Sequence, residues 1–328
     1  GLIYRDGTNI IQNEPRGFIQ DIDDFPIPAR HLLPDIADSK FYGSSFRSKR
    51  KPMTSMVTSR GCPFSCIFCY RLSGQRFRAH SARRVVNEVK HLIEKFGIKE
   101  VHFFDDLFVA NVQRLKEICK LIIDEKVDIT WSCNGRVDII SKNKEIVPLM
   151  KKAGCWYMSF GLESGNQKVL DYLKKGITLE QTRDAVTWVN KNGIRSGGYF
   201  ILGSPIDTKE TIRQTIDFAK SLPLDTAQFG LMSPYEGTEI YEIVKREGGL
   251  SKVDPNEWTP SSGEAPYVPP ALTSQELFSL QKQAYREFMF RPEYLLRQLK
   301  NITNINILRN YIKTGIRFSK IVFLGGEK

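Results

Sequence analysis

The stretch Ser59-Arg60-Gly61-Cys62-Pro63-Phe64-Ser65-Cys66-Ile67-Phe68-Cys69-Tyr70 places three cysteines within eight residues. Cysteine thiolates at short spacing hold iron–sulfur clusters, and a cubane cluster has four irons to ligate. Three protein ligands, Cys62, Cys66 and Cys69, therefore leave one iron able to bind a group from outside the protein. The stretch predicts a metal centre at which chemistry takes place.

A structural zinc site is the alternative for these cysteines. Such a site is closed by four ligands, often two Cys pairs or Cys together with His. His80 is the nearest further donor, and spacings of three and then two intervening residues differ from the paired arrangement of zinc ribbons. The pattern favours the iron–sulfur cluster over zinc.

Short apolar runs alternate with amphipathic stretches from residue 53 onward, which is typical of βα units around a parallel sheet. The first strand leads into the cysteine stretch, and function in such barrels sits on the loops that follow the strands. The predicted fold is α/β: a partial (β/α)6 TIM-like barrel with an N-terminal connector and a C-terminal helical tail. The six strands are expected at residues 53–60, 100–104, 128–133, 156–162, 194–202 and 226–232.

Proline-rich segments divide the chain into four parts. Residues 1–52 are expected to be a Pro-containing connector, 53–250 the barrel, 251–270 a linker and 271–328 the helical tail. Three pairs of residues also predict capping boxes at helix starts, namely Thr178 with Gln181, Asp207 with Glu210, and Thr273 with Glu276.

Composition narrows the class of protein without deciding its function. The chain has 328 residues, of which 41% are hydrophobic and 26% charged, as in ordinary globular proteins. No apolar run approaches the ~20 residues that span a bilayer, and the first residues do not form a signal peptide. Six cysteines, three of them in one loop, fit a reducing compartment, so we expect a cytoplasmic protein. The net charge of +11 is compatible with a nucleic acid, an anionic membrane or a solvated surface.

The pattern C-x3-C-x-aromatic-C, with Phe68 as the aromatic residue, resembles the signature of the radical S-adenosylmethionine (SAM) superfamily. The resemblance implies that the three cysteines hold a [4Fe-4S] cluster whose fourth iron binds the amino and carboxylate groups of SAM. It also implies reductive cleavage of SAM to a 5'-deoxyadenosyl radical that abstracts hydrogen from a substrate. A one-electron reductant such as flavodoxin or ferredoxin is then an expected partner.

Contacts to SAM are expected from the other strand ends. Asp105 and Asp106 end the second strand, where the superfamily places a Gly-Gly-Glu-like segment against the SAM amino group; the match here is by position, since Phe104-Asp105 replaces Gly-Gly. Arg136 follows the third strand and suits the SAM carboxylate, because a guanidinium binds a carboxylate in bidentate fashion.

Two further strand ends complete the predicted SAM site. Glu163 and Ser164 end the fourth strand and could bind the ribose hydroxyls, and Gly203 ends the fifth, where missing Cβ atoms let an adenine approach the backbone. For each of these residues an ordinary loop hydrogen bond or turn is the alternative.

Four stretches resemble the cobalamin-dependent class of the superfamily: residues 25–34, 59–63, 161–165 and 233–238. That class carries an N-terminal Rossmann-like cobalamin domain, a Pro-rich connector and then the barrel. Residues 1 to about 250 resemble the connector and barrel, and we recognise no cobalamin domain in this chain. The expected cofactors are thus the [4Fe-4S] cluster and SAM, with cobalamin if a further domain supplies it.

The class includes methyltransferases and enzymes of lipid and tetrapyrrole assembly. The resemblance therefore predicts an oxidoreductase or transferase that acts on an unactivated carbon of an apolar small-molecule or lipid-like substrate. Basic and apolar side chains together in the tail are compatible with peripheral docking at the inner membrane face. Packing of the tail over the barrel is the alternative. The apolar members are Phe278, Leu280, Phe288, Phe290, Leu295, Leu296 and Leu299.

Two other functions remain open from the sequence. One is an RNA-modifying radical SAM enzyme, although the additional cluster domain and RNA-binding module of such enzymes are not recognised here. The other is a metal-stabilised nucleic-acid-binding protein, which six βα units do not require; nucleic acid is not an expected partner. Cys119, Cys133 and Cys155 are read as buried small hydrophobic residues in preference to a second cluster.

Overall fold

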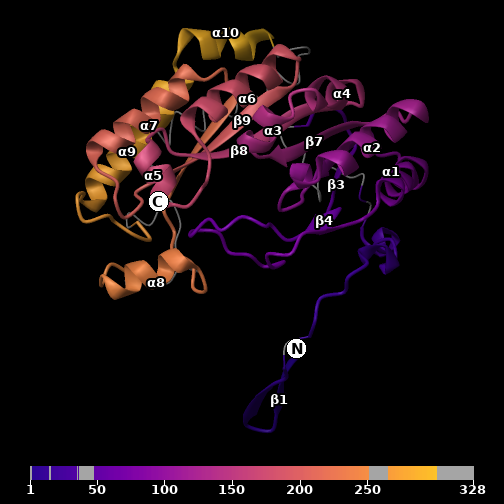
Figure 1. Cartoon of the computed structure of the whole chain (residues 1–328), viewed down its shortest axis with the longest axis horizontal. Coiled ribbons are helices and arrows are strands. Elements are labelled where there is room, and N and C mark those ends of the chain that lie inside the picture. The colour runs from indigo at the N-terminus through magenta and orange to yellow at the C-terminus, as the bar shows by residue number, and fades with distance from the viewer. Residues whose placement is uncertain (1, 15, 35, 37–47, 251–264, 301–328) are drawn as a thin grey trace.

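The computed structural model describes residues 2–14, 16–34, 36, 48–250 and 265–300 (Figure 1). Within these residues six strands form a parallel sheet in the order β10-β9-β8-β7-β6-β3. Each strand therefore lies beside the one that precedes it in the chain, and the predicted partial barrel of six βα units is confirmed. The strands are β3 (Met53–Met56), β6 (Glu100–Phe103), β7 (Thr130–Gly135), β8 (Cys155–Glu163), β9 (Arg195–Leu202) and β10 (Thr226–Leu231).

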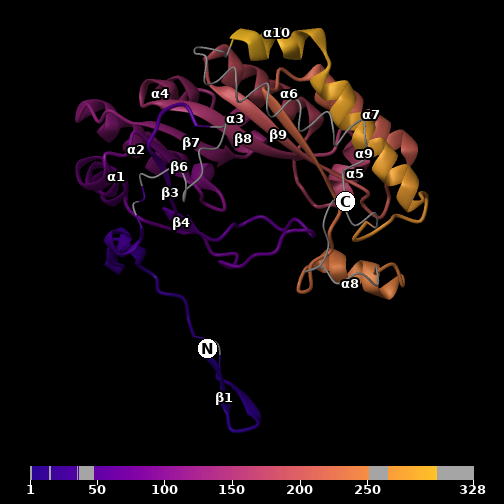
Figure 2. The ribbon, with the colours of Figure 1, turned by 180° about the vertical axis from the view of Figure 1, so that it is seen from behind.

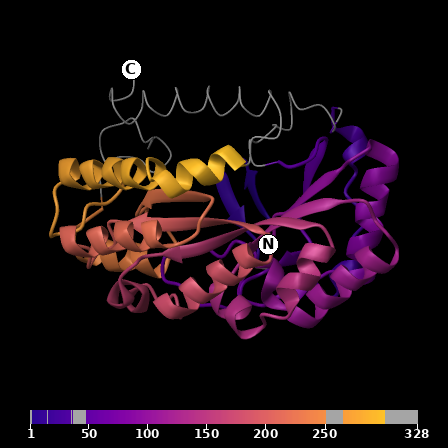
Figure 3. The same ribbon diagram turned by 90° about the horizontal axis from the view of Figure 1, so that it is seen from above.

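The helices between the strands cover the outer face of the curved sheet (Figures 2 and 3). A second group, α8 to α10, follows β10. The helices are α1 (Ala82–Phe96), α2 (Val112–Asp124), α3 (Val137–Lys142), α4 (Ile146–Lys152), α5 (Gln167–Tyr172), α6 (Leu179–Lys191), α7 (Lys209–Ser221), α8 (Glu239–Arg246), α9 (Ser274–Met289) and α10 (Pro292–Lys300).

Alternation along the strands separates a dry face from a polar face. Phe103 and Trp131 are fully buried in the core under the helices, where their rings meet edge to face at 5.5 Å. His102, one residue before Phe103, and Ser132, one residue after Trp131, project from the opposite face, because successive side chains of a strand point to opposite sides. The inner face of the sheet is thus free to carry hydrogen-bonding groups.

The predicted first strand, residues 53–60, is divided in two. β3 ends at Met56, and the next two-residue strand, β4 (Ser59–Arg60), leaves the sheet to pair antiparallel with β5 (Arg78–Ala79). The separation occurs because the carboxylate of Asp105 accepts hydrogen bonds from the Thr58 amide and from the hydroxyl groups of Thr58 and Ser59. β4 and β5 close the base of the cysteine loop.

Two of the three predicted capping boxes are confirmed, at Thr178 with Gln181 and at Thr273 with Glu276. The third prediction was wrong by one residue, since the N-cap of α7 is Thr208 and not Asp207, and its capping-box partner is Thr211 and not Glu210. Asp207 instead accepts hydrogen bonds from the backbone amides of Gly203 and Ser204.

A hairpin that the sequence analysis missed lies at the N-terminus. β1 (Ile3–Asp6) pairs antiparallel with β2 (Asn9–Gln12), and Gly7 at the turn has φ +59°. The hairpin projects away from the barrel (Figure 1). The following connector contacts the barrel, for example through the Arg30–Glu88 ion pair at 2.7 Å and the Asp23–His80 contact at 2.9 Å. The predicted boundaries of the connector, linker and tail stay predictions.

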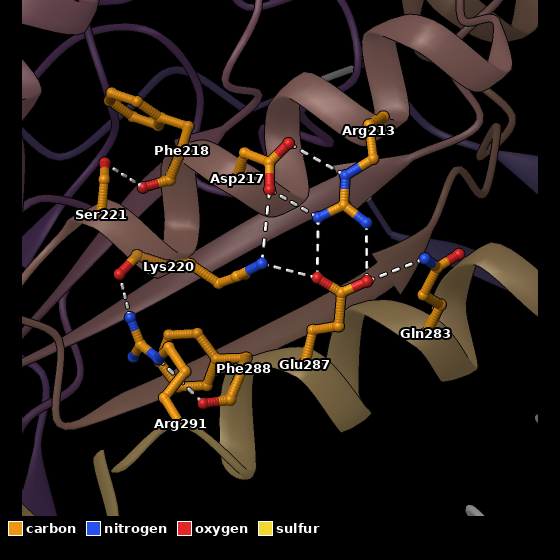
Figure 4. Close-up of polar contacts among 9 residues, drawn as sticks. All are labelled: Arg213, Asp217, Phe218, Lys220, Ser221, Gln283, Glu287, Phe288 and Arg291. Atoms are coloured by element: carbon orange, nitrogen blue, oxygen red, sulfur yellow. Dashed lines mark hydrogen bonds and ion pairs between the residues drawn. The ribbon is translucent and has the colours of Figure 1, made fainter. Parts of the chain in front are cut away.

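The first helix of the tail packs on the barrel. Leu277, Ala284 and Phe288 of α9 are buried against it. A charged network ties α9 to α7: Glu287 binds Arg213 at 2.6 Å and Lys220 at 2.6 Å, and Arg213 also binds Asp217 of its own helix (Figure 4). The Arg213 hydrogen bond is the main cause that holds the pKa of Glu287 well below its usual range.

Side chains of α9 also reach the backbone of β10. The Gln281 amide donates to the Phe229 carbonyl oxygen at 2.8 Å, and the Tyr285 hydroxyl accepts from the Phe229 amide at 3.1 Å.

For α9, the second interpretation of the tail applies: its apolar face packs over the barrel. Phe290, Leu295 and Leu296 are exposed, whereas Leu299 and residues 301–328 lie outside the described side chains. No helix in the described ranges is both long enough and apolar enough to cross a bilayer.

Candidate active site

The cysteine loop follows β4 and depends on one glycine. Gly61 has φ +87°, and a Cβ atom there would lie 2.2 Å from the Arg76 carbonyl oxygen. Only glycine fits this left-handed and crowded position. The Cys62 amide then donates to the Gly74 carbonyl at 3.2 Å, which fixes the start of the loop against its end.

Asp105 anchors the loop from behind. Its side chain is 2% exposed and accepts the three hydrogen bonds from Thr58 and Ser59. The Arg114 guanidinium donates to the Thr58 carbonyl and hydroxyl oxygens at 3.1 and 2.8 Å. Burial raises the pKa of Asp105, and the nearby Arg114 charge opposes this shift. Asp105 is not among the residues that line the cavity beside the cysteines, and the structure does not bring it to the expected SAM site.

One cavity of about 660 Å³ contains all three cysteines. Its wall beside them includes Asp106, Arg136 and Lys175. The sheet supplies the floor, with side chains from β3 and β6 to β9 and from the residue after β6; these floor residues are Met53, Ser55, His102, Phe104, Ser132, Asn134, Tyr157, Ser159, Gly161 and Tyr199.

Several floor side chains are held by one another. His102 Nδ1 lies 2.9 Å from Ser132 Oγ on the neighbouring strand, and the Tyr157 hydroxyl lies 2.7 Å from Thr226 Oγ1 two strands away. The Tyr157 ring can cross β9 only because residue 197 is glycine, where a Cβ atom would lie 2.0 Å from the hydroxyl oxygen. The floor is therefore preorganised and hydrogen-bonding.

Arg136 joins the cysteine loop to the loop after α5. Its guanidinium carbon lies over the Phe64 ring, 3.5 Å from the ring centroid. One terminal nitrogen lies 3.9 Å from Cys66 Sγ, and the other donates to the Lys175 carbonyl oxygen. Its Nε forms an ion pair with Asp138 at 2.8 Å. Arg136 thus lines the cavity, with both terminal nitrogens hydrogen-bonded, whereas its Nε lies beside the Asp138 carboxylate without hydrogen-bond geometry.

Electrostatics around Cys66 favour its thiolate. A hydrogen bond with Cys69 lowers the pKa of Cys66 to about 6, and the nearby Lys175 and Arg136 cations act in the same direction against burial. The same hydrogen bond raises the pKa of Cys69. Thiolates are the form in which cysteines bind metal.

Glu163 and Lys175 form a buried ion pair behind these thiols. Glu163 Oε1 lies 2.7 Å from Lys175 Nζ, and the two side chains are 7% and 11% exposed. Burial alone lowers the pKa of Lys175, but the Glu163 carboxylate and the Cys66 thiolate outweigh it, so the pKa is raised and the amine stays charged. Glu163 does not line the cavity itself; it binds Lys175, which does.

The remaining predicted SAM contacts are spread more widely. Asp106 lines the cavity and accepts from the Gly61 amide at 2.9 Å. Ser164 turns away to Thr215 of α7 at 3.0 Å, and the Gly203 amide donates to Asp207. Phe68 is half-buried, with Lys175 Nζ 5.8 Å from its ring centroid. The structure therefore gathers Asp106 and Arg136 at the cavity, but not Ser164 or Gly203.

The donors present fit an iron–sulfur cluster better than a single ion. In the described part of the chain no three His, Cys, Asp or Glu side chains converge as one zinc ion would need. The cysteines of a cubane bind separate irons, so they need only face one cavity. His80, the extra donor of the zinc reading, contacts Asp23 instead.

The other three cysteines lie on the core side of the sheet. Cys119, Cys133 and Cys155 are at most 1% exposed, and burial raises the pKa of Cys119 and Cys155.

Lys175 and the polar floor were missed from the sequence. A signal for the floor existed in alternate positions with polar groups, such as Tyr157 with Ser159 inside a predicted strand, and Ser132 inside another with Asn134 just beyond its predicted end. No sequence signal marked Lys175, because it lies in a Lys-Lys-Gly loop of the kind typical of a solvated turn.

An open six-stranded βα barrel with a three-cysteine loop after its first strand defines a class of enzymes that use an iron–sulfur cluster with an open iron. The chain matches the family described as the Radical SAM superfamily over residues 56–219. It belongs to the radical SAM superfamily and is an enzyme of that type, whose cofactors are a [4Fe-4S] cluster and SAM.

The relatives include methyltransferases and cyclases. The chain is 35% identical to an uncharacterised methyltransferase of Pyrococcus horikoshii, over 91% of this chain and 63% of the relative. It is 28% identical to the anaerobic magnesium-protoporphyrin IX monomethyl ester cyclase of Rubrivivax gelatinosus, over 74% of this chain and 44% of that protein. The chain thus spans about half to two thirds of the length of these relatives.

A solved structure shares the fold. The cobalamin-dependent SAM radical enzyme OxsB, with aqua-cobalamin and SAM bound, superimposes with a TM-score of 0.64 at 18% identity. The match covers 82% of this chain and 46% of OxsB.

Proposed function

We propose that this chain is the catalytic barrel of a radical SAM enzyme that transfers a methyl group to, or oxidises, an unactivated carbon of an apolar ring substrate of lipid or tetrapyrrole type. The observation that carries the proposal is that Cys62, Cys66 and Cys69 line one shared cavity, whose floor includes side chains held by hydrogen bonds. The methyltransferase and cyclase relatives support it.

The three cysteines would hold the cluster, and Asp106 and Arg136 are the residues best placed to meet the charged groups of SAM. Together these cofactors supply one-electron reductive cleavage of a sulfonium carbon–sulfur bond. Glu163 contributes through Lys175, and the earlier expectations for Asp105, Ser164 and Gly203 receive no support from the positions of their side chains.

The chain's own residues would bind and orient the substrate. Phe104, Tyr157 and Tyr199 offer ring faces, while Ser159 and Asn134 offer hydrogen bonds. Saturated aliphatic side chains are few in this lining, which supports a planar ring bearing heteroatoms more than a linear lipid. The cyclase relative, whose name specifies a tetrapyrrole, agrees with this preference.

Cobalamin, the reductant and the location belong to the proposal as well. OxsB binds cobalamin, and we propose that a further domain would supply it here for methyl transfer. Flavodoxin or ferredoxin would deliver the electron, and a cytoplasmic setting would keep the cluster reduced. Peripheral membrane association now depends on α10, where Leu295 and Leu296 are exposed.

The test is anaerobic reconstitution with iron and sulfide, followed by reduction in the presence of SAM. We expect 5'-deoxyadenosine from the wild-type chain and none from Cys66→Ala. Deuterated-methyl SAM with added methylcobalamin and a porphyrin ester would then reveal methyl transfer as a mass shift in the substrate. Equal 5'-deoxyadenosine from both proteins would falsify the catalytic assignment.

A further inference from the structure

Lys175 is a buried ammonium on the wall of the cysteine cavity. Its side chain is 11% exposed, and its Nζ bonds Glu163 at 2.7 Å. Removing an ammonium from water costs several kcal/mol unless it is paired, so this position is not an ordinary surface lysine. The neighbouring Lys174 shows the contrast, because its ion pair with Glu239 is about half exposed on both sides.

The strand backbone is shaped to hold the ion pair. The register of β8 and β9 shifts between Gly161 and Glu163, and Glu163 has φ +61°, which is rare for a residue with a side chain. A Cβ atom at Gly161 would lie 2.3 Å from Glu163 Oε1 and 2.8 Å from Lys175 Nζ. The carboxylate and the ammonium therefore occupy space that only glycine leaves open.

The distance from Lys175 to the cysteine loop is also fixed. Arg136 donates to the Lys175 carbonyl with one nitrogen and lies 3.9 Å from Cys66 Sγ with another. The Ile67 amide, inside the loop, donates to the Leu173 carbonyl at 3.2 Å. Two ties thus connect the lysine loop to the cysteines.

We propose that Lys175 and Glu163 are a positioning pair that sets the reduction potential of the cluster. The inference rests on the proposed assignment of the cluster to Cys62, Cys66 and Cys69. The ammonium lies on the cavity side and stabilises the electron that the cluster accepts, while the carboxylate partly cancels that effect. Cluster potentials follow nearby charge and exposure, and charges interact strongly where water is excluded.

The test is an EPR-monitored redox titration of the reconstituted cluster without SAM, with dithionite as the one-electron donor. Lys175→Gln is expected to shift the midpoint to more negative potential and Glu163→Gln to more positive potential. The double variant should return toward the wild-type value. Lys174→Gln is the matched control and should leave the potential unchanged, because its charge is screened by solvent.

Two results would overturn the inference: Lys175→Gln with the same midpoint as Lys174→Gln, or Glu163→Gln with no positive shift. If Lys175→Gln does not retain iron, two other variants still test the inference. Glu163→Gln should shift the midpoint to more positive potential, and Lys175→Arg, which conserves the charge, should keep the wild-type midpoint. Because SAM is omitted, a role of Lys175 in SAM binding alone predicts no shift. Failure of the cluster assignment would instead appear as missing iron in the wild-type protein.

Discussion

Replacing Asp105 with Asn should loosen the base of the cysteine loop. Asp105 and Asp106 are adjacent, yet the first is 2% exposed with three hydrogen bonds, and the second is exposed with one bond from the Gly61 amide. The same substitution at Asp106 is thus a control that differs mainly in burial.

The magnitude follows from the donors that surround the carboxylate. An amide oxygen can keep the Thr58 amide bond, but the amide nitrogen then faces two hydroxyl groups that had been donors. Hydrogen bonds to a charged acceptor contribute about 1.5–3 kcal/mol each, and Arg114 also loses its buried counter-charge. We expect Asp105→Asn to lower the free energy of unfolding by about 3 kcal/mol. Asp106→Asn should stay within about 0.5 kcal/mol, as for other exposed sites.

The assay is urea unfolding of the iron-free protein, followed by far-UV circular dichroism under anaerobic conditions. In a parallel thermal unfolding experiment, the same loss of about 3 kcal/mol should lower the melting temperature by about 4 °C, from the usual unfolding entropy per residue for a chain of this length. Iron content after reconstitution should fall in parallel. Equal unfolding midpoints for the two variants would refute the anchoring role of Asp105.

Three further outcomes are expected. Glu287→Gln should cost about 1 kcal/mol at pH 7. Because Arg213 lowers the pKa of Glu287 in the folded state, this contribution is fully present above the ordinary pKa of 4.5 and is lost progressively as the pH falls from there toward the folded value. The urea midpoints of variant and wild type should therefore converge as the pH falls, and a constant gap would contradict this. Gly197→Ala should cost about 1–3 kcal/mol through its clash with the Tyr157 hydroxyl, and less in a Tyr157→Phe background; an additive double-mutant cycle would argue against that contact. Thr178→Ala removes the cap of α6 and should cost about 1 kcal/mol in thermal unfolding, whereas no change would mean that the cap is dispensable.

The sheet was predictable because its signals are local. The run at residues 156–162 is mostly apolar in the sequence, and β8 is buried at all but one of its nine positions. The cap at Thr178 depends only on the first turn of the helix that follows it. The start of α7 was placed one residue early because Asp207 and Thr208 are both good caps, and only the fold assigns Asp207 to the Gly203 and Ser204 amides.

The site was predictable only where the motif lies. Cys62, Cys66 and Cys69 lie within eight residues, so their spacing carries the information. Lys175 acquires its environment from Glu163, 12 residues earlier, and from Arg136, 39 residues earlier. No sequence pattern distinguishes such a lysine from Lys174. The tail had the same difficulty, because an apolar helix face fits a membrane and a barrel equally well.

The contacts of Gln281 and Tyr285 with Phe229 have a consequence for how the chain can be shortened. These side chains bond the amide and carbonyl groups of Phe229 in β10, with which a strand of a second molecule would otherwise pair. Helix α9 therefore covers the edge strand of the sheet and blocks such pairing. A truncation at residue 270 would uncover this strand, and self-association of the shortened chain could then be mistaken for a change in lipid binding. Any trimmed version intended for biochemistry should therefore retain residues 274–289.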